Sequence, residues 1–130
     1  MLYQRTLTVP ANTLFSTPVS ATLKLAYGAS TRREIEFPDG CHGLVHVRVN
    51  EHGWQVLPWS RDEWLASDGN VIVDDSVYPL ETTPYVFTLV AYNEDTANDH
   101  TVTLRVQVAE GAIAAGLAKF ISALKRSGVI

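Results

Sequence analysis

Apolar and polar residues alternate one by one along much of the chain, the pattern of a strand with one buried and one exposed face. Every second residue of 101–108 is Val or Leu, and every second residue of 19–25 is Val, Ala or Leu. Further candidate strands lie at residues 3–9, 33–37, 44–49, 54–57, 71–73 and 85–92. The sequence therefore predicts about eight short strands before residue 109.

Residues typical of turns separate these segments, at 27–30, 38–40 and 68–70 among other places. Short, evenly spaced strands with no helix between them favour an antiparallel fold over a parallel α/β arrangement. We therefore predict a mainly β domain at residues 1–108, an antiparallel β-sandwich or jelly roll. The irregular link at residues 58–70 is expected to lie at one end of it.

The period of the pattern changes after Val108, and the last segment, residues 109–130, is predicted to form an amphipathic α-helix. Its apolar residues recur at helical spacing: Ile113, Leu117, Phe120, Ile121 and Leu124. Glu110 near the start and Lys125 with Arg126 near the end match the helix dipole. Gly128 is expected to end the helix.

Four of these apolar residues form a stripe with 4-3-4 spacing, which is typical of a coiled-coil seam over about two heptads. Small residues such as Ala115 and Gly116 allow another backbone to approach closely. Three interpretations stay open at this point. The helix packs on its own sandwich, or it packs on a neighbouring subunit, or it lies on a membrane surface with its basic residues toward the head groups.

Composition limits the function classes. The 130 residues are 46% hydrophobic and 18% charged, which suits one packed domain, and the net charge of -4 argues against a nucleic-acid-binding role. Cys41 is the one cysteine, so an intrachain disulfide is excluded and a reducing compartment is expected. Residues 1–9 lack the features of a signal peptide, and residues 109–124 are too short and too charged to span a membrane.

Cys41, His42 and His46 are residue types that bind zinc. On a strand, however, the two histidines share a face with Arg48, and Cys41 points to the other face. At most two ligands would then meet beside a cation, so we predict no metal site there, with the histidines exposed and the cysteine buried.

Acidic residues gather near residues 68–75 and 94–99, but their spacing does not match a calcium-binding loop, and acidic turns are common because Asp accepts local backbone hydrogen bonds. The chain contains no Gly-x-Ser-x-Gly, phosphate-binding glycine loop or His-Glu-x-x-His motif. We therefore predict no enzymatic activity and no cofactor.

Three tryptophans, Trp54, Trp59 and Trp64, lie within eleven residues. Such residues act as core plugs, as anchors at a protein interface, or as stacking platforms for sugars. A carbohydrate-binding module that uses these aromatic side chains is therefore one alternative function.

Three segments, PVSATLKLAYG (18–28), EIEFPDGCHGLVHVRVN (34–50) and PYVFTLVAYNE (84–94), resemble small virion proteins of tailed phages in which a β-sandwich decorates the capsid. The resemblance implies a structural protein of the virion, made in the host cytoplasm. It also implies a homo-oligomer, a trimer among the options, that packs on a major capsid or other virion protein. The helix residues Ile113, Leu117, Phe120, Ile121 and Leu124 are the expected contact surface.

Overall fold

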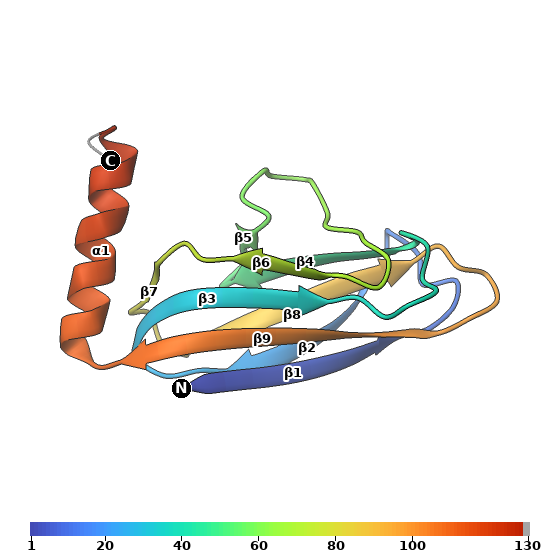
Figure 1. The fold of residues 1–130 in the computed structure, drawn as a ribbon, viewed down its shortest axis with the longest axis horizontal. Helices are drawn as coiled ribbons and strands as arrows, with labels where there is room; N and C mark the ends of the chain where they lie inside the picture. The colour runs from blue at the N-terminus through green and yellow to red at the C-terminus, as the bar shows by residue number, and fades with distance from the viewer. Residues whose placement is uncertain (129–130) are drawn as a thin grey trace.

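The computed structural model describes residues 1–128, which form nine β-strands and one α-helix (Figure 1). The elements are β1 (Leu2–Val9), β2 (Val19–Lys24), β3 (Gly28–Glu36), β4 (Val45–Glu51), β5 (Trp54–Leu57), β6 (Val71–Asp74), β7 (Tyr78–Leu80), β8 (Val86–Asn93), β9 (His100–Glu110) and α1 (Ala112–Arg126). The predicted fold class, a mainly β chain with a C-terminal helix, is confirmed.

The strands pair antiparallel in two sheets. One sheet has the order β1-β9-β3-β6, with β7 also paired to β3, and the other has the order β2-β8-β4-β5. Strands β6 and β7 pair with successive parts of β3, so together they take the place of one strand. With β6 and β7 counted as one, every connection crosses between the sheets except the β4–β5 hairpin. This order is that of an eight-stranded jelly roll.

The core lies between the two sheets and is built by the alternating side chains. Val45, Val47 and Val49 of β4 are fully buried, and so are Val102 and Leu104 of β9. Burial of one such side chain stabilises the fold by about 1.5–3 kcal/mol. The predicted inward face of residues 45–49 is therefore confirmed, although the strand starts at Val45 and His42 lies in the preceding turn, with a φ of 51°.

The elements near the helix differ most from the sequence-based prediction. Residues 28–30 belong to β3 rather than to a turn, and β7 was not predicted at all. Residues 109–110 extend β9, and the helix begins only at Ala112. Glu110 accepts a hydrogen bond from the Tyr3 hydroxyl at 2.7 Å and lies outside the helix, whose first turn has no acidic residue.

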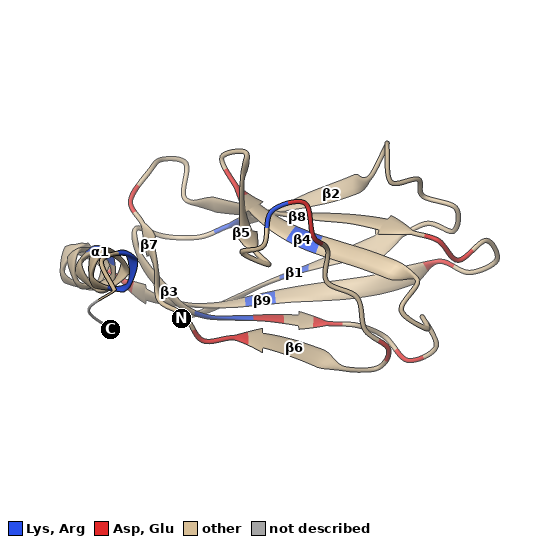
Figure 2. Cartoon of the chain, turned by 90° about the horizontal axis from the view of Figure 1, so that it is seen from above, with Lys and Arg blue, Asp and Glu red and all other residues tan. Residues whose placement is uncertain are grey.

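Helix α1 stands at one end of the sandwich, across the direction of the strands (Figures 1 and 2). The Gly111 N–H donates to the Tyr27 carbonyl at 2.8 Å and fixes the point where β9 turns into the helix. Ala115 and Ala118 are buried, and α1 contacts β3 and β7. Within residues 1–128, no helix has the length and apolar character needed to cross a membrane.

Candidate functional site

The outer face of α1 carries the apolar stripe that the sequence singled out. Ile113 is 89% exposed, Phe120 61% and Leu117 59%, while Ile121 and Leu124 are half-buried. The helix does dock on its own sandwich, but it does so through its alanines, and the predicted contact stripe points to the opposite side. On the helix surface, residues 113, 117, 120 and 124 share one face.

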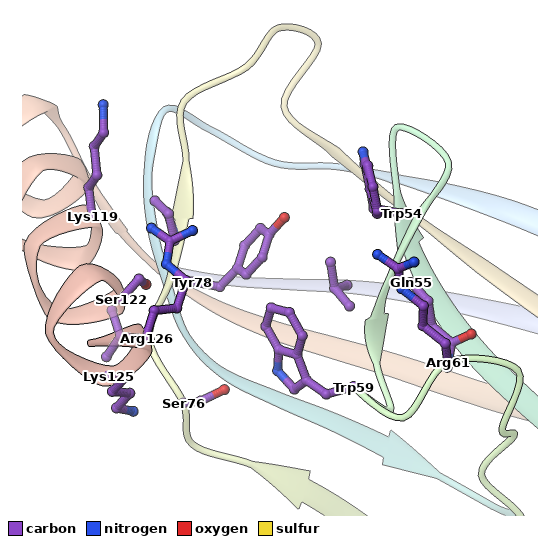
Figure 3. A pocket seen from close by; sticks show the side chains of 13 residues that line it. Trp54, Gln55, Trp59, Arg61, Ser76, Tyr78, Lys119, Ser122, Lys125 and Arg126 are labelled. Atoms are coloured by element: carbon purple, nitrogen blue, oxygen red, sulfur yellow. The ribbon is translucent and has the colours of Figure 1, made fainter. Parts of the chain in front are cut away.

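The inner face of α1 changes character along the helix. Its first half is held against the sheet by alanines, whereas its second half faces the sandwich across a cleft of about 540 Å³. The helix side of this cleft is lined by Lys119, Ser122, Lys125 and Arg126. In Figure 3, Arg126 reaches from the helix toward Tyr78, and Lys119 and Lys125 lie at the two edges.

The opposite wall of the cleft is aromatic (Figure 3). Trp54 at the start of β5 and Trp59 just after it are each 62% exposed. The ring centroid of Trp59 lies 6.1 Å from that of Tyr78, and the Arg61 guanidinium carbon lies 4.9 Å from the centre of the Trp54 ring. The cleft thus combines flat apolar surfaces with cationic groups.

Tyr78 is held in place by a hydrogen bond from its hydroxyl to Glu51, at 2.6 Å. Partial burial raises the pKa of Glu51. Burial together with this hydrogen bond raises the pKa of Tyr78 well above its ordinary range. The Tyr78 ring also packs edge-on against the buried Phe87. The aromatic wall is therefore anchored to the core.

A smaller hollow of about 240 Å³ adjoins the cleft and shares Trp54, Gln55 and Arg61 with it. Arg48 and Asn50 line this hollow, and the Arg48 Nε and the Asn50 Oδ1 are buried without a hydrogen-bond partner. Buried polar atoms normally have a partner. Both atoms are closed to solvent, so a ligand in the hollow would meet other atoms of these side chains and Asp62, which also lines it.

Charge is distributed unevenly around the cleft. Four of the ten Lys and Arg residues line it, and none of the fourteen Asp and Glu residues does. Within residues 1–128, Arg61, Lys119, Lys125 and Arg126 form no ion pair. Helix α1 has three basic and no acidic residues, and most acidic residues lie away from it (Figure 2).

The structure separates the three tryptophans. Trp64 lies apart from the cleft. The centroid of its ring is 4.8 Å from that of Tyr92, and the Arg48 guanidinium carbon is 4.3 Å from the centroid of the Trp64 ring. Trp54 and Trp59 therefore belong to the candidate site and Trp64 does not. Sequence analysis did not indicate Tyr78, and it linked the basic helix residues to a membrane surface rather than to the tryptophans. The spacing of Lys119, Ser122 and Arg126 on one helix face was the signal that could have indicated this basic face.

Cys41, His42 and His46 do not meet in the structure. The buried Cys41 thiol donates to the Ser67 carbonyl at 2.9 Å, and His42 is exposed beside Asp68. His46 stacks on Tyr92 with a centroid distance of 4.5 Å. Among residues 1–128, no three His, Cys, Asp or Glu side chains are grouped as a metal would require.

The acidic loop after β8 is explained by local hydrogen bonds. Asp95 Oδ1 accepts from the backbone N–H groups of Ala97 and Asn98, at 2.9 and 3.1 Å, and Oδ2 lies 2.8 Å from His100 Nε2. The backbone hydrogen bond from Ala97 and the contact with His100 lower the pKa of Asp95 to about 2. The carboxylate therefore organises the loop.

This pKa predicts a pH effect on stability. An unfolded Asp has a pKa of about 3.9, so the contribution of Asp95 is present above that pH and is lost as the pH falls toward 2. In the wild type, Asp95 takes up about one proton when the chain unfolds in this pH range, and this uptake makes the free energy of unfolding depend on pH. Asp95→Asn should remove that contribution to the slope. Urea unfolding followed by tryptophan fluorescence from pH 2 to 5 measures the slope. The exposed Asp62, replaced by Asn, is the control, and equal slopes for both variants and the wild type would contradict the assignment.

No protein-family model matches the chain, and no curated protein matches it at a significant level. A functional proposal therefore rests on the geometry described above and on the resemblance of the three sequence segments.

Proposed function

We propose that this protein is a structural subunit that works by self-association, with a second copy of the chain covering the outer face of α1. The observation that carries the proposal is the exposed stripe of Ile113, Leu117 and Phe120. A lone exposed apolar residue needs no explanation, but three large ones in a row on one helix face are typical of an interface.

The stripe suits another copy of itself. Its 4-3-4 spacing allows knobs-into-holes packing with an identical helix, and closed homo-oligomers use such self-complementary surfaces. The surface that one short helix can bury is smaller than the roughly 1,000 Å² that a specific interface buries. Sandwich edges are expected to supply the rest, since edge strands β1 and β6 carry the exposed Leu2, Val71 and Val73.

We further propose that the assembly is a virus particle, in which the chain is a capsid decoration or spike-like subunit. Two observations support this: the resemblance of three segments to phage virion proteins, and the jelly-roll strand order, which viral capsid proteins use. In this role the protein is made in the host cytoplasm, binds a major capsid or other virion protein, and performs no catalytic step.

Leu117→Asp is expected to weaken self-association strongly, because a carboxylate at the centre of the seam loses its hydration when a second helix packs on it. Sedimentation equilibrium should show a dissociation constant weaker by about 100-fold, the effect of losing a central interface residue. Leu14→Asp is the matched control, since Leu14 is 62% exposed in a loop outside the helix. A wild-type protein that stays monomeric at high micromolar concentration would overturn the proposal.

The virion part has its own test. Mass spectrometry of particles purified from the source organism should detect the chain in a fixed ratio to the major capsid protein. Absence from purified particles would contradict the virion role and would leave self-association intact.

A further inference from the structure

We propose that the cleft between α1 and the tryptophans of the β5 edge binds an acidic saccharide, one that carries carboxylate or sulfate groups. The inference is independent of self-association, since Ile113, Leu117 and Phe120 are not among the residues that line the cleft. A volume of about 540 Å³ lies within the usual range of about 300–1,000 Å³ for small-molecule sites.

Helix α1 turns its charged face, rather than its apolar face, toward the sandwich. An amphipathic helix at the edge of a domain normally turns its apolar face inward and its charges outward. Here the apolar stripe faces outward, while Lys119, Lys125 and Arg126 line the cleft on the sandwich side. None of these cations has a carboxylate partner within residues 1–128, so an anion in the cleft would be attracted to them without competition from an existing ion pair.

The helix dipole explains only part of this arrangement. Lys125 and Arg126 lie in the last turn, where a positive charge is favourable in any case. Lys119 lies in the middle of the helix, and Arg61 comes from the segment after β5. Neither of these two gains from the helix terminus, so the helix dipole does not explain why all four cations line this cleft.

The aromatic wall determines the class of anion. One face of a pyranose ring presents C–H groups, which pack well on a flat indole face, and Trp54 and Trp59 are both exposed enough to offer one. An inorganic anion would gain nothing from the tryptophans, and a neutral apolar ligand would gain nothing from the cations. A sugar that carries negative groups uses both, with charge-assisted hydrogen bonds to Arg61 and Arg126.

The adjoining hollow gives room for a second sugar unit. It is lined by Arg48, Asn50 and Asp62. An oligosaccharide that runs from the cleft past Trp54 would place a neutral unit beside these polar side chains, where its hydroxyl groups can donate to Asp62 and its acidic unit stays in the cleft. Longer acidic oligosaccharides should therefore bind more tightly than single acidic sugars.

The test is isothermal titration calorimetry of the full chain with defined probes. The acidic probes are trigalacturonic acid, which is carboxylated, and a heparin-derived tetrasaccharide, which is sulfated. The comparison probes are maltotriose, hexaglutamate and sodium sulfate. We expect at least one acidic sugar to bind about tenfold or more tightly than maltotriose, and more weakly as salt is added.

Substitutions locate the binding. The Trp54→Ala/Trp59→Ala and Lys119→Gln/Arg126→Gln variants should each weaken binding by about tenfold or more. Phe15→Ala and Lys24→Gln are matched controls, an exposed aromatic residue and an exposed cation outside the cleft, and should leave binding unchanged. Circular dichroism and sedimentation of each variant check that fold and oligomeric state are intact.

Several outcomes would overturn the inference. These are failure of both acidic sugars to bind at millimolar concentration, equal affinity for maltotriose, and binding that survives the tryptophan substitutions. Hexaglutamate as the preferred ligand would instead identify a site for acidic peptides, and sulfate that competes as well as the sugars would identify a simple anion site. None of these outcomes bears on self-association.

Discussion

Arg33→Met is expected to lower the free energy of unfolding by about 3–5 kcal/mol, the usual cost of removing one partner from a buried ion pair. Arg33 is 1% exposed. Its guanidinium donates to the Ser30 hydroxyl at 2.7 Å and to the carbonyl and hydroxyl of Ser76 at 2.6 and 2.8 Å, and it lies 3.2 Å from the Asp74 carboxylate. Methionine fills much of the space but replaces none of these donors.

The same network predicts how the loss depends on pH. Partial burial alone would raise the pKa of Asp74, but hydrogen bonds from Ser76 and the charge of Arg33 lower it. The stabilisation from this carboxylate is therefore present above the unfolded pKa of about 3.9 and is lost below it. The difference between wild type and Arg33→Met should accordingly shrink as the pH falls below about 4.

Urea unfolding at pH 7 and pH 3 measures both effects. Arg32→Met is the control, since the side chain of Arg32 is half-exposed and its ion pairs with Glu34 and Asp75 span 3.5 and 3.6 Å. Exposed pairs of this kind contribute about 0–1 kcal/mol. An Arg33→Met loss no larger than that of Arg32→Met would show that the buried network does not stabilise the fold.

The strands that alternate strictly were predicted well, because one buried face fixes both period and register. Residues 45–49 and 101–108 are examples, and their apolar side chains are buried in the core. Strand β7 was missed because Tyr78-Pro79-Leu80 carries no alternation of its own. It is a strand because it pairs with residues 28–30, a contact between distant parts of the chain that no local pattern reveals.

The candidate site was predicted only in part. Trp54 and Trp59 stood out by residue type, whereas Tyr78, Arg61 and the helix cations join them only through the fold. The helix pattern correctly indicated an apolar stripe, but the apolar stripe is not the face that docks on the sheet. Ala115 and Ala118 let the helix backbone approach β3 and β7 closely, which larger side chains would prevent.

The junction that sets the position of the helix depends on Gly28. Gly28 lies opposite Glu110 in the β3–β9 pairing, and its φ of 152° disfavours any residue with a side chain. A Cβ atom there would lie 2.1 Å from the Ala109 carbonyl oxygen and 2.8 Å from the Glu110 Cα. Both contacts are with backbone, so one of the two strands would have to move.

Gly28→Ala is therefore expected to lower the free energy of unfolding by about 3 kcal/mol, the sum of overpacking and backbone strain. Gly116→Ala in helix α1 is the control, because a Cβ there meets nothing within 4 Å. This substitution should raise the free energy of unfolding by about 0.5–1 kcal/mol. Thermal and urea unfolding give both values. Since β9 leads directly into α1, displacement of β9 should also widen the cleft and weaken binding of an acidic sugar even where the variant is fully folded. A loss below about 1 kcal/mol, smaller than a typical overpacking cost, would mean that the junction relaxes freely and does not hold the helix in place.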